Sequence, residues 1–165
     1  CGPLREVFDV FHRFDDATSL EVVAMDIDPR ALEFAQRQAQ AAGVASRVRF
    51  VHADLMAVAD QAIDLIPQDM IYSVGLVDYF DDPSVVRLLD WIYDRLALGG
   101  RALLGNFHPC NPDRALMDYV LEWRLTHRTE ADMNHLFQAS RFAAPCTRIL
   151  FEAEGINLFA EGVRS

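Results

Sequence analysis

The chain has 165 residues, of which 52% are hydrophobic and 24% charged, a composition that excludes a disordered segment and predicts one folded domain. Its net charge is −10, and arginine supplies all 15 basic residues because the chain contains no lysine. Nucleic acid binding needs a basic patch for the phosphates, and an anionic membrane surface repels an acidic protein. We therefore expect a small-molecule substrate, no nucleic acid partner and no membrane insertion.

The cysteines and the hydropathy pattern favour a cytoplasmic protein. Cys1, Cys110 and Cys146 are odd in number and form no C-x-x-C pair, so we expect unpaired thiols in a reducing compartment. No apolar run is long enough to cross a membrane, and no signal peptide is visible. No metal is expected, because His108 and Cys110 lack further recognisable ligands.

Strand and helix patterns alternate through residues 1–110. Apolar and β-branched runs predict strands, and apolar residues at helical spacing predict helices. The first helix carries an apolar face of Val7, Phe8, Phe11 and Phe14, for which we expect core packing. The predicted strands are 20–28, 47–54, a segment of 68–80 ending near residues 73–75, and 101–109, and the predicted helices are 4–14, 29–43 and 82–100.

The remaining residues predict two helices and a hairpin. We expect helices over 113–128 and 130–140, and an antiparallel hairpin over 147–165 that turns at Gly155. Alternating strands and helices predict an α/β fold, a doubly wound Rossmann-like sheet closed by this C-terminal hairpin. Ligands of such sheets bind beyond the carboxyl ends of the strands, which is where candidate site residues are sought.

Two acids lie at the end of the strand predicted over 20–28, and we expect different roles for them. Asp26 comes at the end of the buried run, where a carboxylate can accept hydrogen bonds from both hydroxyls of a ribose. Asp28 directly precedes Pro29, which fits the first position of a helix, so Asp28 fits its N-cap. Ile27, between them, either lies flat on a nucleobase or packs in the ordinary way.

Two further positions complete a possible nucleoside site. Asp54 ends the next strand in "HADL", where its carboxylate could accept from an adenine amine while the amide of Leu55 donates to a ring nitrogen; an ordinary turn aspartate is the alternative. Gly2, in "CGP", lies about 24 residues before Asp26, near the spacing between a glycine-rich turn and a ribose-binding acid.

Taken together, these segments resemble the class I S-adenosylmethionine-dependent methyltransferases. The matching pieces, in the family's order, are "CGP", "VVAMDIDPRAL", "VHADL", "DMIYSVGLVDYFDD" and "LALGGRALLGNF". The resemblance covers most of residues 1–110 and implies S-adenosyl-L-methionine as the cofactor. It places Ser73, Val74 and Gly75 beside the cofactor, in addition to Gly2 and the residues that follow the first two strands.

The segment "NFHPCNPDRALMDYVLEWRLTHRTEADM" is similar to bacterial methyltransferases that make 3-hydroxy fatty acid methyl esters. This resemblance suggests a fatty acid carboxylate as the methyl acceptor. His108 occupies the place of a general base, although a loop histidine is an equal alternative, and Tyr79 is the second catalytic candidate. The candidate substrate-binding residues are Asn106, Tyr119, Trp123 and Arg124. On a helix over 113–128, Leu116, Val120, Trp123 and His127 would share one face, as a lid or as ordinary packing on the sheet.

The resemblance also exposes a departure. The family's first strand lies between the strands that carry Asp26 and Ser73, and it precedes "CGP", so it is absent from this sequence. A central gap would leave backbone groups unpaired. We therefore expect one methyltransferase domain over 1–165 that is incomplete at its N-terminus, with a helical substrate insertion over about 112–143. The missing strand would come from a further N-terminal segment or from a second copy in a homo-oligomer.

Two other functions remain open at this stage. An NAD-dependent oxidoreductase shares the acid at the strand end, although the Tyr-x-x-x-Lys pair of many such enzymes is impossible without lysine. A non-catalytic nucleoside-binding domain would keep the cofactor residues and lack an acceptor.

Overall fold

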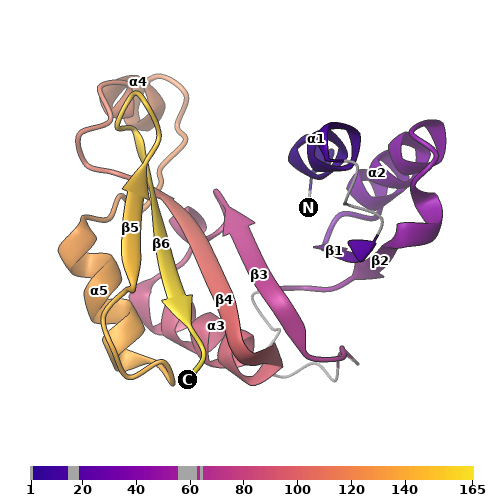
Figure 1. Ribbon diagram of the computed structural model, residues 1–165. Helices are drawn as coiled ribbons and strands as arrows, with labels where there is room; N and C mark the ends of the chain where they lie inside the picture. Colours follow the sequence, from indigo (N-terminus) through magenta and orange to yellow (C-terminus); the bar gives the residue numbers. More distant parts are fainter. Residues whose placement is uncertain (1, 15–18, 56–62, 64) are drawn as a thin grey trace. The chain divides into compact units, whose positions relative to one another are not determined.

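The computed structural model describes residues 2–14, 19–55, 63 and 65–165, shown in Figure 1. The chain divides into two compact units, residues 1–58 and residues 59–165. No helix within the described ranges is both long enough and apolar enough to cross a membrane.

The first unit is a two-stranded parallel sheet with helices. β1 and β2 pair in register from Val22 opposite Val48 to Asp26 opposite His52, so both strands end at the same edge. Small side chains on α2, Ala35 among them, are fully buried in the core of this unit. Its elements are α1 (Arg5–Arg13), β1 (Val22–Asp26), α2 (Pro29–Ala41), the 3-10 turn η2 (Ala45–Arg47) and β2 (Val48–His52).

The expected apolar face of α1 is confirmed except at its end. Val7 is buried, and Phe8 and Phe11 pack against the core of the first unit. The expectation for Phe14 is wrong: this side chain is 60% exposed. Phe14 is the C-cap with an extended backbone, so it no longer follows the helical spacing that would turn it inward.

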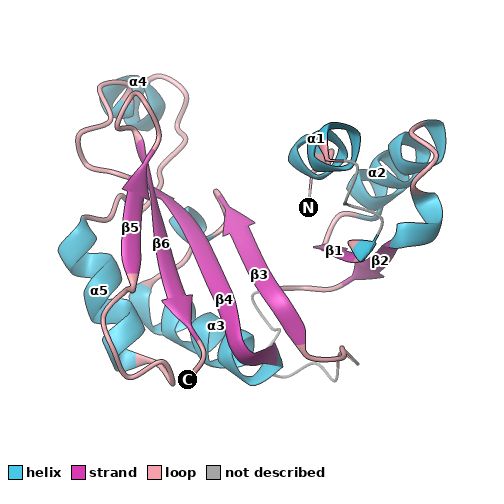
Figure 2. Ribbon diagram, in the orientation of Figure 1, coloured by secondary structure: helices cyan, strands magenta, loops and turns pink. Residues whose placement is uncertain are grey.

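The second unit contains a mixed four-stranded sheet. The strand order is β3-β4-β6-β5; β3 and β4 are parallel, and the other two pairings are antiparallel. Helices α3 and α5 pack against each other and against the sheet, as Figure 2 shows. The elements are β3 (Gln68–Val74), η4 (Val77–Tyr79), α3 (Asp82–Arg95), β4 (Leu96–Phe107), α4 (Arg114–Tyr119), α5 (Glu130–Ala139), β5 (Arg148–Phe151) and β6 (Asn157–Val163).

The C-terminal hairpin is confirmed. Gly155 has a φ of +70° in the turn between β5 and β6, a conformation that glycine adopts at little cost. The α/β character of the chain is confirmed as well. Each sheet is formed within one unit, and the further strand expected between the strands of Asp26 and Ser73 stays a prediction.

Helix α3 has the buried face that its sequence predicts but not the predicted end. Asp81 caps the helix by accepting the backbone N–H of Ser84 at 3.0 Å, and the apolar positions up to Ile92 are buried. The helix ends at Arg95 rather than at the glycines, and β4 begins at Leu96. A Cβ at Gly100 would lie only 2.9 Å from the carbonyl oxygen of Gln68, so the glycine allows β4 to approach β3 closely.

The prediction of one helix over residues 113–128 is wrong. α4 covers only Arg114–Tyr119, and Glu122 has a φ of +51°, which a helix does not permit. The chain then runs outside regular helix up to Thr129. Two of its amides bond to distant carbonyls: Thr126 N–H donates to Asp78 O at 2.8 Å, and Arg128 N–H donates to Phe107 O at 2.9 Å. These long-range bonds replace the helical ones.

The helix predicted after this segment is confirmed as α5. Thr129 and Asp132 form a capping box, in which each side chain accepts the other residue's backbone N–H.

Cys110 and Cys146 carry free thiols, and burial raises the pKa of Cys146 to about 11, so this thiol is protonated at neutral pH.

Candidate active site

Asp26 lies at the end of β1, at the turn into α2. Its Oδ1 accepts the backbone N–H of Asp28 at 3.0 Å, and its Oδ2 accepts the backbone N–H of Gly2 at 3.2 Å. Partial burial acts to raise the pKa of Asp26, but hydrogen bonds to the charged form outweigh it and hold the pKa below its usual value. Because each carboxylate oxygen has two lone pairs, this ionised group can also accept hydroxyl donors.

Asp28 caps α2, as its position before Pro29 predicts. Its Oδ1 accepts the backbone N–H of Arg30 at 2.9 Å, and the Arg30 guanidinium reaches both carboxylate oxygens. Hydrogen bonds from the side chain and then the backbone of Arg30 hold the pKa of Asp28 below its usual value. The two neighbouring acids therefore have different surroundings: Asp28 serves its helix, whereas Asp26 is held at the strand end.

The other cofactor candidates of the first unit lie beside Asp26. Ala53 N–H donates to Asp26 O at 3.0 Å, and His52 Nε2 lies 2.8 Å from the carbonyl oxygen of Ile27, which fixes the turns after both strands. The Ile27 side chain is 57% exposed, as a surface for a flat ring requires. Asp54 and Leu55 follow β2 at the same edge and are partly buried.

The remaining cofactor candidates belong to the second unit. Ser73 and Val74 end β3 and pair with Leu104 and Gly105 of β4, and Gly75 follows with a φ of +72°. A Cβ at Gly75 would lie 3.9 Å from Oδ2 of the buried Asp78. The C-terminal end of β3 is thus a tight turn that leads into η4.

An aromatic cluster lies at the C-terminal ends of β3 and β4. Trp123 Nε1 donates to the hydroxyl oxygen of Tyr79 at 2.9 Å. The rings of Phe107 and Trp123 pack edge to face, with their centroids 6.4 Å apart. The ring of Phe107 also contacts the ring of His127, with their centroids 5.7 Å apart. Tyr79 and Trp123, predicted separately for catalysis and substrate binding, are therefore brought together. This group, Tyr79, Phe107, Trp123 and His127, is called the aromatic cluster below.

Two other substrate candidates lie apart from these contacts. Tyr119, the last residue of α4, is 82% exposed, and Arg124 is exposed as well. The shared helical face expected for Leu116, Val120, Trp123 and His127 does not form, because the helix ends before Val120. Trp123 and His127 instead reach the cluster from an extended segment.

His108 has fixed partners on the hairpin side of β4. Its Nε2 lies 3.2 Å from Glu130 Oε2, its Nδ1 accepts the backbone N–H of Cys110 at 3.2 Å, and its ring packs edge-on against Phe151. The accepting Nδ1 implies that a neutral ring carries its proton on Nε2. Both nitrogens are engaged, which favours the loop role that was the alternative to a general base.

Asn106 is fully buried, and its amide has internal partners. Its Nδ2 donates to the carbonyl oxygens of Phe107 and Thr126, both at 2.9 Å, and its Oδ1 accepts from Arg128 at 2.9 Å. These contacts favour a supporting role beneath the cluster over direct contact with a substrate.

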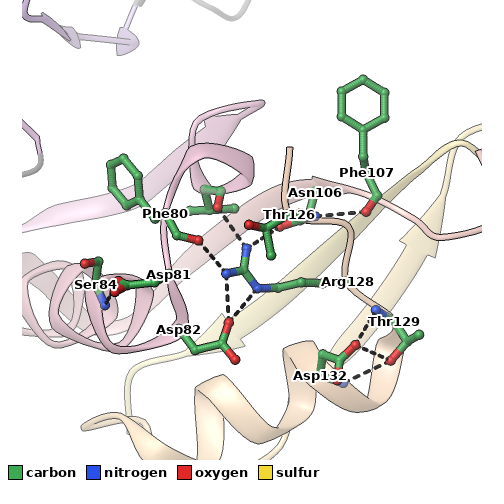
Figure 3. Close-up of polar contacts among 11 residues, drawn as sticks. Phe80, Asp81, Asp82, Ser84, Asn106, Phe107, Thr126, Arg128, Thr129 and Asp132 are labelled. Carbon is green, nitrogen blue, oxygen red and sulfur yellow. Dashed lines mark hydrogen bonds and ion pairs between the residues drawn. The ribbon is translucent and has the colours of Figure 1, made fainter. Parts of the chain in front are cut away.

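Two buried charged residues in this region were missed from the sequence. Arg128 lies under the cluster, with its guanidinium bonded to η4, α3 and β4 (Figure 3). Asp78 accepts Phe107 N–H at 2.8 Å through Oδ1, and burial raises its pKa. Neither residue stands out in "VDYFDD" or "LTHRTEAD", because charged residues in such polar stretches are usually exposed.

Comparisons with known proteins identify the family. A family model described as "Methyltransferase domain" matches residues 1–100, which is more than half of the chain. The chain belongs to this methyltransferase domain family. The expectation of a methyltransferase-family domain is therefore confirmed, and the oxidoreductase alternative gains no support.

Solved structures share the Rossmann-like methyltransferase fold. The chain is similar to N,N-8-amino-8-demethyl-D-riboflavin dimethyltransferase from Streptomyces davawensis, with a TM-score of 0.75 and 17% identity over 99% of this chain and 47% of that one. It is similar to mitomycin 7-O-methyltransferase, with a TM-score of 0.71 and 19% identity over 97% of this chain and 53% of that one.

A third similar structure is magnesium protoporphyrin IX methyltransferase from Synechocystis with bound SAH, with a TM-score of 0.65 and 16% identity over 88% of this chain and 64% of that one. The chain thus spans about half to two thirds of the length of these proteins. No curated protein sequence matches the chain significantly.

Proposed function

We propose that this chain is an S-adenosylmethionine-dependent methyltransferase domain that methylates a small molecule in the cytoplasm, with a fatty acid carboxylate as the acceptor. The observation that carries the cofactor assignment is the Asp26 carboxylate, which lies at the end of a parallel strand and accepts the backbone N–H groups of Asp28 and Gly2, in a member of the methyltransferase family. One similar structure contains SAH, which supports the same cofactor here.

The residues after β1 and β2 fit the nucleoside part of this cofactor. Asp26 would accept the ribose hydroxyls, the exposed Ile27 would contact the adenine face, and Asp54 with Leu55 would bind the adenine edge. The amide of Gly2 supports the Asp26 carboxylate from the other side.

The cofactor supplies an electrophilic methyl group on a sulfonium, and the chain's own residues hold and orient the acceptor. A carboxylate acceptor is already ionised at neutral pH, so no general base is needed. This agrees with the engaged nitrogens of His108. Phe107 and Trp123 offer apolar surface to an acyl chain and help to exclude water.

Tyr79 is suited to orient the acceptor carboxylate. Its oxygen accepts the Trp123 indole N–H, so the phenol proton remains available to donate to another acceptor. Arg124, the exposed residue that follows Trp123 in the chain, would pair with an acceptor carboxylate in a bidentate fashion. Both residues contribute orientation, which is the main demand of an in-line substitution.

Calorimetric titration of the full gene product with S-adenosylmethionine and with NAD tests the cofactor assignment. We expect saturable binding of S-adenosylmethionine and none of NAD. A methyl-transfer assay with 3-hydroxydecanoate, compared with its methyl ester, then tests the acceptor, because the ester has no free carboxylate. Binding of NAD alone would refute the proposal, and binding of S-adenosylmethionine without transfer to any acid would refute the acceptor class.

A further inference from the structure

Arg128 has an unusually complete set of partners for a charged residue that is only 2% exposed. Its Nε and Nη2 donate to Asp82 Oδ1 at 3.0 and 2.8 Å. The other guanidinium contacts are Nη1 to Val77 O at 2.8 Å, Nη1 to Asn106 Oδ1 at 2.9 Å and Nη2 to Phe80 O at 2.7 Å. A guanidinium has five N–H donors, so all of them are used.

These contacts join four separate parts of the second unit at one point (Figure 3). Two of the acceptors, the carbonyls of Val77 and Phe80, flank Tyr79 in the chain. Asp82 is the first residue of α3, and Asn106 lies near the end of β4. The backbone N–H of Arg128 itself donates to Phe107 O at 2.9 Å.

Contacts of Arg128 and of the neighbouring Thr126 restrain the two segments that carry the partners of the Tyr79–Trp123 hydrogen bond. Tyr79 is held through the backbone on either side of it. Trp123 belongs to the extended segment that is anchored at Thr126, whose N–H bonds to Asp78 O, and at Arg128. Arg128 touches neither aromatic side chain in these contacts. It bonds directly to the backbone on both sides of Tyr79, and it anchors the C-terminal end of the segment that carries Trp123, whose own N–H donates to Met117 O at 2.8 Å.

We propose that Arg128 is a positioning residue for the acceptor side of the site. It holds Tyr79 and Trp123 in the geometry of their hydrogen bond and thereby favours binding of the acceptor. The inference rests on the proposed function for its consequence in catalysis, but the contact itself can be measured without turnover. Lysine cannot substitute, because a single ammonium has three donors and no planar fork to reach acceptors in η4, α3 and β4 together.

The alternative is a purely structural clamp that only stabilises the unit. Both α3 and α5 begin beside Arg128, since Asp81 caps one and Thr129 caps the other. The positive ends of two helices and a buried guanidinium repel one another, and acids such as Asp82 and Asp132 offset this. A stability loss in an Arg128 variant is thus expected in either case and cannot decide between them.

Trp123 fluorescence decides between the two. The chain has two tryptophans, so Trp91→Phe leaves Trp123 as the single reporter. In this background we compare Arg128→Lys with Tyr79→Phe, which removes only the hydroxyl that accepts the indole N–H. Arg141→Lys is the matched control, because Arg141 is exposed and bonds to Asp94 of α3 at 2.7 Å, outside the aromatic cluster.

We expect acrylamide quenching of Trp123 in Arg128→Lys to rise to the value of Tyr79→Phe, and the Arg141→Lys control to stay at the parent value. In turnover with 3-hydroxydecanoate, the KM of the acid should rise about tenfold, as for one lost hydrogen bond, with the KM of S-adenosylmethionine unchanged. Asp82→Asn, which keeps the shape and weakens the guanidinium contact, should shift quenching the same way if Arg128→Lys does not fold.

Parent-like quenching in a folded Arg128→Lys or Asp82→Asn variant with a lowered Tm would overturn the inference and leave a structural clamp. Equal rises in both KM values would overturn it as well. If the parent protein transfers no methyl group to 3-hydroxydecanoate, the acceptor proposal fails, whereas the quenching result still decides the role of Arg128.

Discussion

Replacement of Asp26 by asparagine tests the cofactor site with the least change in shape. The carboxylate accepts two backbone N–H groups, from Asp28 at 3.0 Å and Gly2 at 3.2 Å. Asparagine keeps one acceptor oxygen and replaces the other by an NH₂ group, which donates. The position that now accepts from Gly2 N–H and would accept from a ribose hydroxyl can then no longer accept from both. The loss of one hydrogen bond to a charged group costs about 1–3 kcal/mol, which weakens binding about 5- to 150-fold.

Calorimetric titration with S-adenosylmethionine measures this change, and Asp28→Ala is the matched control two residues away. Asp28 caps α2 through Arg30 N–H at 2.9 Å, so its replacement should lower the Tm and leave the Kd unchanged. A parent-like Kd in Asp26→Asn, or equal weakening in both variants, would refute the assignment of the ribose to Asp26. Thermal unfolding of each variant checks that the first unit is still folded.

Two further predictions concern the second unit. Gly162→Ala should destabilise the chain by about 1–3 kcal/mol, because the new Cβ would lie 2.4 Å from a ring carbon of Phe137; urea unfolding measures the loss, and an unchanged midpoint would contradict this packing. Burial raises the pKa of Asp78 above 3.8, so the folded state binds its proton more tightly, and the stability it contributes is greatest below about pH 4 and is lost as pH rises through the folded pKa. Asp78→Asn should therefore gain stability relative to the parent as the pH is raised, and a difference in Tm that does not change between about pH 4 and 7 would contradict the burial of an ionisable group here.

Much of the local structure could be predicted from the sequence. The break from an apolar run to Asp-Ile-Asp-Pro predicts a strand, an N-cap and a helix start, and β1, the Asp28 cap and α2 follow it. The hairpin about Gly155 is confirmed for the same kind of reason, because the turn geometry needs a residue that tolerates positive φ. These features depend on residues that are neighbours in the chain.

The wrong predictions concern segments whose structure depends on contacts with residues far away in the chain. Residues 113–128 have good helical spacing, but beyond α4 the amides of Thr126 and Arg128 bond to carbonyls of η4 and β4 instead. The expectations for Phe14 and for the end of the helix predicted over 82–100 failed at helix ends, where the chain leaves the helical spacing and the direction of every following side chain changes.

The sequence by itself determined the family, the order of strands and helices, and the different positions of Asp26 and Asp28, because motifs and capping depend on short-range spacing. Only the tertiary structure decided which charged residues are buried. Arg128 meets its partners across 22 to 51 positions of the chain, and Trp123 reaches Tyr79 across 44. A buried guanidinium is stable only where several acceptors converge on it, and that convergence is a property of the fold that no local pattern encodes.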